Sequence, residues 1–267
     1  MSSFDTLMLH YGKNRLVVRK DEPFTFYATF IAGEYKMLNV KLGDVILDAG
    51  SNIGDFTVYA SKKVGSSGKI IAVEPNPKNL AILNKNIKLN NLNNVIILPY
   101  ALSNVKKKMY LTEDSSGGTL TTDRVSGISV NTITLDDILT DLKLQRFDII
   151  KMDIEGSEEM VFSSPQFLLK VRELAMELHG KKNIAEIPDI LQKNGFIVHN
   201  FTLSELSINV LKAIFFHLPS IINAEFMTNF IMMKGMISYL IRKKIPIPSL
   251  SDTNFALIYA FKKDFSP

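Results

Sequence analysis

The stretch VILDAGSNIGDF, residues 45–56, combines an acid with two glycines, a pattern that can hold a ligand. Glycines allow the backbone to turn sharply and to approach a bound molecule closely. A dinucleotide-binding loop reads G-x-G-x-x-G, whereas this loop has Asn52 where the middle glycine would stand. Asp48 precedes the first glycine, and a carboxylate there would repel a pyrophosphate. The loop therefore favours a ligand that carries an ammonium group.

Glu74 ends the next apolar run, KIIAVE. A carboxylate at the end of such a run can accept hydrogen bonds from both hydroxyls of a ribose, which disfavours cofactors with a 2′-phosphate. S-adenosylmethionine (SAM) has both a free ribose and an ammonium group, so the two signals together favour SAM. One alternative is a nicotinamide cofactor. The other is that the two glycines only form a turn and bind no ligand.

Two further apolar runs, FDIIKMD and VRELAMELH, carry charged side chains at their ends. We expect Asp153 and Glu155 to meet Glu177 and His179, because the carboxyl ends of neighbouring parallel strands lie at one edge of a sheet. Methyl transfer is an in-line displacement that depends on positioning, and an alcohol acceptor also needs a base. We predict that Asp153 orients or deprotonates the acceptor, that Glu177 and His179 assist, and that Glu155 supports the loop.

Other roles are open for these side chains. Lys151 could simply pair with an acid, and Glu155 could stabilise the start of the helix that follows. The four predicted catalytic side chains also offer oxygen and imidazole ligands for a divalent metal. Acids and a histidine near a helix start have commoner explanations, so we predict no metal ligands.

The elements that must position these groups alternate regularly. Buried strands and helices follow one another from Val45 onward, which predicts an α/β, Rossmann-like fold. We expect seven strands in a mostly parallel sheet with one antiparallel strand at the end of the chain, and an inserted hairpin within residues 106–130. Thr134 to Asp137 reads as a capping box, and residues 24–30 as an N-terminal strand. The expected sheet strands are 45–49, 69–74, 95–99, 147–153, 171–178, 196–201 and 255–261.

The chain resembles the FkbM-type branch of the class I SAM-dependent methyltransferases between about Tyr35 and Gly180. The likeness is carried by VILDAGSNIGDFT, KIIAVEPNPKNLAILNKNIKLNN, VNTITLDDI, FDIIKMDIEGSEEMV and ELAMELH. Many class I enzymes place an acid after the third strand to bind adenine; here Ser103 stands near that place. The cofactor-binding residues that the resemblance implies are Asp48, Gly50, Ser51, Asn52, Gly54, Glu74, Pro75, Asn76, Ala101 and Ser103.

The composition of the chain limits its possible partners and its localisation. The sequence has 267 residues, no cysteine and a formal net charge of +4, with scattered lysines that do not suggest a nucleic-acid partner. No signal peptide is read at the N-terminus. We expect one domain, with an N-terminal extension at 1–40 and a helical insertion at 203–250. The predicted localisation of the protein is cytoplasmic, and contact with the inner face of the membrane is an open alternative.

The insertion is rich in apolar residues between 208 and 241. We favour core packing or a homodimer interface for this segment over peripheral membrane contact. The predicted activity is methyl transfer from SAM to a hydroxyl of a small-molecule or glycan acceptor. The alternatives are a SAM-binding module that acts as a membrane or partner scaffold through this segment, and a nicotinamide-dependent oxidoreductase.

Overall fold

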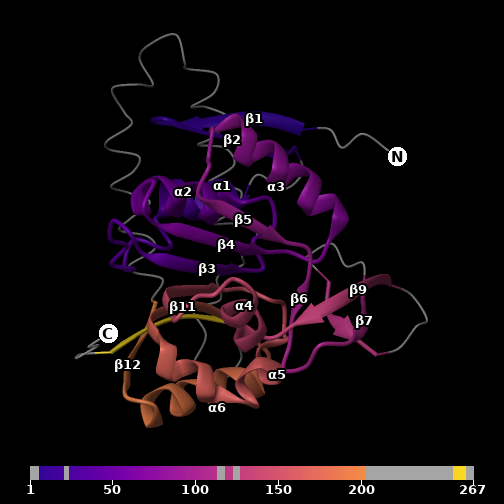
Figure 1. Cartoon of the computed structure of the whole chain (residues 1–267), viewed down its shortest axis with the longest axis vertical. Helices are drawn as coiled ribbons and strands as arrows, with labels where there is room; N and C mark the ends of the chain where they lie inside the picture. Colours follow the sequence, from indigo (N-terminus) through magenta and orange to yellow (C-terminus); the bar gives the residue numbers. More distant parts are fainter. Residues whose placement is uncertain (1–5, 21–23, 113–117, 123–126, 202–254, 263–267) are drawn as a thin grey trace. The chain divides into compact units, whose positions relative to one another are not determined.

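A computed structural model of the protein describes residues 6–20, 24–112, 118–122, 127–201 and 255–262. These residues belong to two compact units, which are described separately. The smaller unit includes the described residues up to Lys36. The larger unit includes residues from Met37 to Asn200 and the C-terminal strand (Figure 1). The predicted helical insertion at 203–250 lies outside the described residues.

The smaller unit contains an antiparallel pair of strands, β1 (Thr6–Tyr11) and β2 (Asn14–Arg19), followed by helical turns. The prediction of a strand at residues 24–30 is wrong. These residues form α1 (Phe24–Phe26) and the π-helix η1 (Tyr27–Ala32). The run is mostly apolar, interrupted by Thr25 and Thr29, so periodicity cannot separate a buried strand from a buried helix. All side chains of η1 are buried, as expected of a helix without a polar face.

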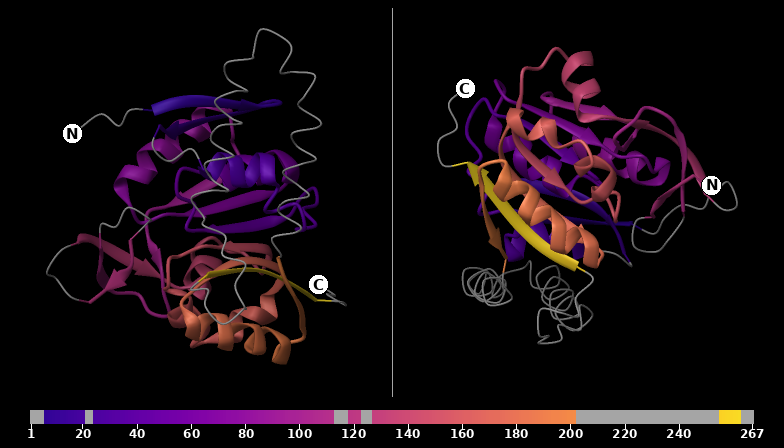
Figure 2. Two further views of the ribbon diagram at one scale, coloured as in Figure 1. Left: turned by 180° about the vertical axis from the view of Figure 1, so that it is seen from behind. Right: turned by 90° about the horizontal axis from the view of Figure 1, so that it is seen from below.

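The larger unit is built on a seven-stranded sheet in the order β12-β13-β11-β10-β3-β4-β5 (Figures 1 and 2). Its strands are parallel except β13, which runs antiparallel to both β11 and β12. This arrangement confirms the predicted fold class. The strands are β3 (Val45–Ala49), β4 (Lys69–Val73), β5 (Val95–Leu98), β10 (Phe147–Met152), β11 (Val171–His179), β12 (Phe196–Asn200) and β13 (Phe255–Lys262).

Helices connect these strands and bury their apolar sides against the sheet. Asn76 caps α3, because its side chain accepts a hydrogen bond from the Lys78 amide at 2.9 Å, and Pro77 occupies the first helical position. Pro188 lies inside α6. The helices are α2 (Asp55–Val64), α3 (Pro77–Leu89), α4 (Leu135–Asp141), α5 (Glu158–Phe162), the 3-10 helix η2 (Pro165–Lys170) and α6 (Lys181–Lys193).

The inserted hairpin belongs to a second, smaller sheet in the order β6-β9-β7-β8, drawn beside one end of the main sheet in Figure 1. Its strands are β6 (Ala101–Leu102), β7 (Lys108–Leu111), β8 (Leu120–Thr121) and β9 (Ile128–Ile133). The predicted capping box is confirmed. Thr134 Oγ1 accepts from the Asp137 amide at 3.0 Å, and Asp137 Oδ2 accepts from the Thr134 amide at 3.1 Å.

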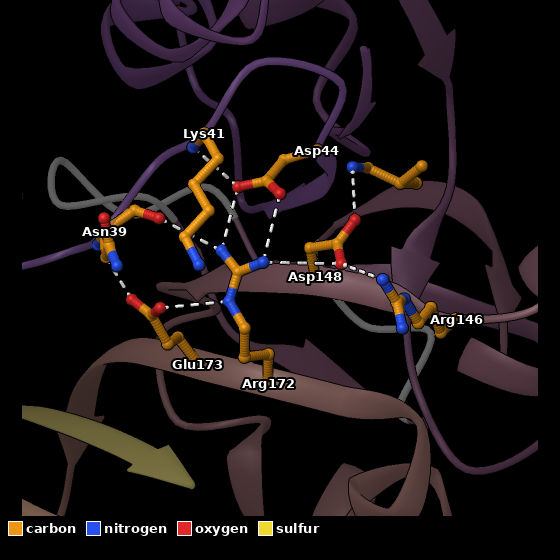
Figure 3. A network of polar contacts seen from close by, with 8 residues as sticks. Asn39, Lys41, Asp44, Arg146, Asp148, Arg172 and Glu173 are labelled. Carbon is orange, nitrogen blue, oxygen red and sulfur yellow. Dashed lines mark hydrogen bonds and ion pairs between the residues drawn. The ribbon is translucent and has the colours of Figure 1, made fainter. Parts of the chain in front are cut away.

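A network of ion pairs joins the amino ends of β3, β10 and β11 (Figure 3). The Arg172 guanidinium binds both carboxylate oxygens of Asp44, at 2.8 and 3.0 Å. It also donates to Glu173 at 3.0 Å and lies 3.5 Å from an Asp148 oxygen. Bidentate arginine–carboxylate contacts are geometrically specific, so this network fixes the relative register of the strands at their amino ends.

Among the helices that the structure describes, none is both long and apolar enough to cross a lipid bilayer.

Candidate functional site

The loop after β3 needs its two glycines for contacts within the protein. Gly50 has a φ of +73°, and a Cβ there would lie 1.7 Å from the backbone oxygen of Asp153. Gly54 has a φ of +88°, and a Cβ there would lie 2.4 Å from Leu83 Cδ1. The first glycine lets the loop pass close to the end of β10, and the second lets α3 pack closely against the start of α2.

Asp48 lies beneath this loop and not on a ligand-accessible surface. Its side chain is fully buried, accepts from Thr57 Oγ1 at 2.5 Å and lies 3.5 Å from Lys151 Nζ. Lys151 Nζ also donates to the Gly50 carbonyl at 2.8 Å. Burial raises the pKa of Asp48, with Lys151 opposing. Burial alone would lower the pKa of Lys151, but Asp48 and Asp153 outweigh it and raise it. Lys151 therefore has the pairing role that the sequence left open.

Glu74 holds the loop and the start of α3 together. Its Oε2 accepts from the Asn52 amide at 2.9 Å, and its Oε1 accepts from the Asn76 amide at 2.8 Å. Asn79 Nδ2 donates to Oε1 at 3.2 Å. Burial raises the pKa of Glu74, and the hydrogen bonds from the amides of Asn76 and Asn52 oppose that rise. Asn52 has a φ of 47°, a left-handed conformation that asparagine tolerates better than most residues.

One pocket brings together the ends of β3, β4 and β10. Several predicted cofactor residues line it, as do Asp153 and Glu155. The lining residues are Gly50, Asn52, Val73, Glu74, Pro75, Asn79, Tyr100, Ala101, Leu102, Leu111, Gly118, Leu120, Asp153, Ile154, Glu155 and Ser157. The predicted residues outside this lining are Asp48, Ser51, Gly54, Asn76, Ser103, Glu177 and His179. The contact expected between Asp48 and a ligand's ammonium group stays a prediction, since Asp48 is buried beneath the loop and lies outside this lining.

The pocket offers unpaired polar atoms beside an apolar wall. Asn52 Oδ1, Asp153 Oδ1 and Ser157 Oγ are buried and have no hydrogen-bond partner within the described part of the chain. Buried polar atoms without partners are rare, and a polar ligand would satisfy them. Together with the Glu74 carboxylate, they fit a molecule that has ribose hydroxyls and a charged amino acid end, as SAM has.

The hairpin contributes residues that the sequence analysis missed. Leu111, Gly118 and Leu120 line the pocket beside Tyr100 and Leu102. A flat apolar group such as adenine would find aliphatic and aromatic contacts there. In the sequence of β7, KMYL, Met109 and Leu111 alternate with Lys108 and Tyr110. This alternation indicates a strand with one buried face, but it does not say which surface that face meets.

The four predicted catalytic residues lie at the carboxyl ends of β10 and β11. His179 Nε2 is 3.5 Å from Glu155 Oε2 and 4.0 Å from Asp153 Oδ1. Atoms of Asp153, Glu177 and His179 that could act as ligands all lie within 4.8 Å of one another. Glu155 has a φ of 52°, a strained conformation for a residue with a side chain. The structure thus brings together the residues that the strand pattern predicted would converge.

Glu158 is a further member of this cluster that the sequence analysis did not select. It is fully buried, and its Oε1 lies 3.1 Å from His179 Nδ1, while Asn183 donates to its Oε2 at 3.0 Å. Burial alone lowers the pKa of His179, but the hydrogen bond to Glu158 and the nearby carboxylates raise it to about 9. Burial and then the charge of Asp153 raise the pKa of Glu155 to about 7, with His179 opposing.

Comparisons with known proteins agree with this geometry. The family model described as the methyltransferase FkbM domain matches residues 48–198. Methyltransferase sdnD of Sordaria araneosa is 28% identical over 211 residues, which cover 65% of this chain and 81% of that protein. Hexuronic acid methyltransferase AglP of Haloferax volcanii is 26% identical over 153 residues, covering 56% of this chain and 62% of that protein.

Methyltransferase FkbM of Methylobacillus flagellatus, a solved structure, matches with a TM-score of 0.50 at 16% identity, over 65% of this chain and 44% of that chain. At this identity the match speaks for the fold alone. The family model, in contrast, spans more than half of the sequence and includes the loop after β3, Glu74 and both strands that carry the acidic cluster. The chain therefore belongs to the FkbM family of class I SAM-dependent methyltransferases.

Proposed function

We propose that this methyltransferase transfers the methyl group of SAM to a hydroxyl oxygen of a small-molecule or glycan acceptor. One observation carries the proposal. Asp153 and Glu155 line the same pocket as Gly50, Asn52 and Glu74. Acids that can bind and deprotonate an acceptor therefore share a wall with the residues suited to the cofactor.

The cofactor end of the pocket follows from the contacts described above. When bound, SAM supplies a methyl group on a sulfonium, which is a good leaving group. Glu74 would accept hydrogen bonds from the ribose hydroxyls, while Asn52 and Pro75 would flank them. Ala101 and the hairpin leucines would contact the adenine. Lys151 holds the Gly50 carbonyl and Asp48, and so fixes the loop that would face the amino acid end.

The acceptor end depends on the acidic cluster. Asp153 is partly exposed and lines the pocket, so it is placed to orient the acceptor hydroxyl or to take its proton. His179 lies beside Asp153 and Glu155 and can stabilise the negative charge that either carboxylate carries. Glu177 shares this edge of the sheet, and Glu155 supports the loop between β10 and α5.

The acceptor class is supported by chemistry and by a relative. A cluster of carboxylates and an imidazole suits hydrogen bonding to the hydroxyls of a sugar. One relative is a hexuronic acid methyltransferase, and this chain aligns with 62% of it. A sugar or glycan hydroxyl is therefore the first acceptor to test.

The alternatives have less support. An oxidoreductase would need a nicotinamide site, whereas the matching family is one of methyltransferases. A role as a membrane or partner scaffold would depend on residues 203–250, which lie outside the described residues.

The test uses the full chain with SAM labelled in its methyl group and a panel of free and glycosidically linked sugars, uronic acids included. The expected product is a methyl ether, which keeps its label through mild alkali. Label that alkali releases as methanol would indicate an ester on a carboxylate. Label found in a methylamine would indicate a nitrogen acceptor, and either result would contradict transfer to a hydroxyl.

Asp153→Asn separates binding from chemistry in this proposal. We expect turnover to fall by about 10²- to 10⁴-fold, because a general base contributes about that factor, while SAM affinity changes little. Glu159→Gln is the matched control, since Glu159 is exposed and pairs with Lys182 away from the cluster. An Asp153→Asn variant with the turnover of the parent would remove Asp153 from its assigned role.

A further inference from the structure

We propose that Asp153, Glu177 and His179 form a binding site for a divalent cation of the Mg²⁺ or Mn²⁺ type. Their potential ligand atoms lie within 4.8 Å of one another at the carboxyl ends of β10 and β11. Two ligands of a six-coordinate ion with bonds of about 2.1 Å lie about 3.0 Å apart when adjacent and about 4.2 Å apart when opposite. The three side chains would therefore have to draw together by about an ångström or more to bind an ion. The inference deepens the proposed function, on which its catalytic role rests.

The setting of His179 is the first argument. Histidines that bind metals usually donate their second ring N–H to a carboxylate, which fixes the ring and its tautomer. His179 Nδ1 faces Glu158 Oε1 at 3.1 Å, and Glu158 is fully buried and held by Asn183 at 3.0 Å. This arrangement turns Nε2 toward Asp153, which is the orientation that a metal ligand needs.

Asp153 provides the second argument. Its Oδ1 is buried and has no hydrogen-bond partner among the described residues, although it faces His179 Nε2 at 4.0 Å. Burying a carboxylate oxygen without a hydrogen bond costs free energy, and a cation between Asp153 and His179 would offset this cost. Asp153 also lines the pocket, so the cation would lie where an acceptor can reach it.

The ligand types indicate the kind of cation. Two carboxylates suit Mg²⁺ and Mn²⁺, and the imidazole favours Mn²⁺ over Mg²⁺. Three protein ligands leave positions open for acceptor oxygens. An ion there would lower the pKa of a bound hydroxyl and hold it in place for transfer. Asp153 would then orient the acceptor through the ion.

This inference revises the prediction of no metal ligands, which came from the sequence alone. The sequence places two acids and a histidine at strand ends, where such residues have many explanations. It does not reveal the contact between Glu158 and the far side of the histidine ring, because Glu158 lies on a different element. That contact orients the histidine ring so that Nε2 of His179 faces Asp153, as a metal ligand would.

The test is a titration of the metal-stripped full chain with MnCl₂, in which electron paramagnetic resonance reports free Mn²⁺. We expect saturable binding of one Mn²⁺ per chain, weakened at least tenfold by His179→Gln and by Asp153→Asn. Glu158→Gln should weaken it by about 10- to 100-fold, the usual effect of losing a partner behind a ligand. Glu159→Gln removes the same charge from the adjacent, exposed position and should bind as the parent does.

Thermal unfolding of each variant checks that it is folded, and Glu177→Gln replaces any variant that is not. Absence of saturable Mn²⁺ binding would overturn the inference, as would equal weakening by Glu159→Gln and the ligand variants. Calorimetry with SAM on the same samples keeps the two proposals distinct. SAM binding without Mn²⁺ binding would overturn the cation site alone, whereas Mn²⁺ binding without SAM binding would overturn the proposed function.

Discussion

The carboxylates at the two ends of the strands of the main sheet are paired to different degrees. At the amino edge, Arg172 contacts Asp44, Asp148 and Glu173 at once, so each carboxylate has a cationic partner (Figure 3). Arg146 adds a second partner to Asp148 at 3.1 Å. The carboxylates at this edge are held by pairing within the protein, which is an arrangement suited to stability.

At the carboxyl edge, the carboxylates crowd around one histidine. Asp153, Glu155 and Glu158 all approach His179, while Lys151 is bonded to Asp48 and to the loop after β3. Buried oxygen atoms there have no hydrogen-bond partner among the described residues. Local rules of polar satisfaction are often broken at functional sites. Ion pairs within the protein therefore stabilise the amino ends of the strands, whereas the carboxyl ends of the same strands carry polar groups that a ligand can bind.

Arg172→Met tests the ion pairs at the amino ends of the strands and has the largest expected effect on stability. It would leave three carboxylates without their shared cation, so we expect the free energy of unfolding to fall by about 3–5 kcal/mol. Urea denaturation of the full chain measures this loss. Lys170→Met is the matched control, because it removes an exposed pair with Asp136 and should cost at most about 1 kcal/mol. Equal losses for the two variants would contradict the contrast.

Much of this fold follows from the sequence because its signals are local. The apolar runs that form β3, β4, β10 and β11 are bounded by polar residues. The capping box from Thr134 to Asp137 is defined by four consecutive residues and can be recognised in the sequence. The prediction of a strand at residues 24–30 was wrong, since a mostly apolar run has no clear period that separates a strand from a helix. β10 is also buried along its whole length, but its place in the regular alternation of strands and helices identified it as a strand, whereas residues 24–32 lie outside that alternation.

The site was predictable in its position but not in its contacts. Parallel strands predicted that Asp153 and His179 would meet, and they do. The burial of Asp48 against Lys151, the role of Glu158 behind His179 and the hairpin leucines in the pocket depend on long-range packing. Side chains at such positions look alike in a single sequence, so only the structure distinguishes a ligand contact from an internal pair.

Gly50→Ala tests how tightly the loop after β3 is fitted to the carboxyl edge. A Cβ there meets the Asp153 backbone oxygen, and the positive φ adds strain, so we expect a loss of at least about 2 kcal/mol in stability. SAM binding should fall with it. Gly156→Ala offers a control with a φ of +92° but with nothing within 4 Å of the added Cβ. If thermal unfolding shows equal losses for both, the close packing of Gly50 is unimportant.

Glu155→Gln tests the crowding of charge and has the smallest expected effect on stability. The raised pKa of Glu155, about 7, means that its surroundings disfavour the ionised form. At pH 8 with a chelator present, the neutral variant should be more stable than the parent by on the order of 1 kcal/mol. Glu159→Gln should change the unfolding midpoint little. A Glu155→Gln protein less stable than the parent would argue that the cluster is well compensated.

The most direct test of the whole account is calorimetric titration of the full chain with SAM. We predict one SAM per chain, and binding weakened by about 10- to 100-fold in Glu74→Gln, because charge-assisted hydrogen bonds to the ribose would be lost. Glu159→Gln should bind as the parent does. No heat of binding with the parent protein, or equal affinity in Glu74→Gln, would contradict the assignment of this pocket to SAM.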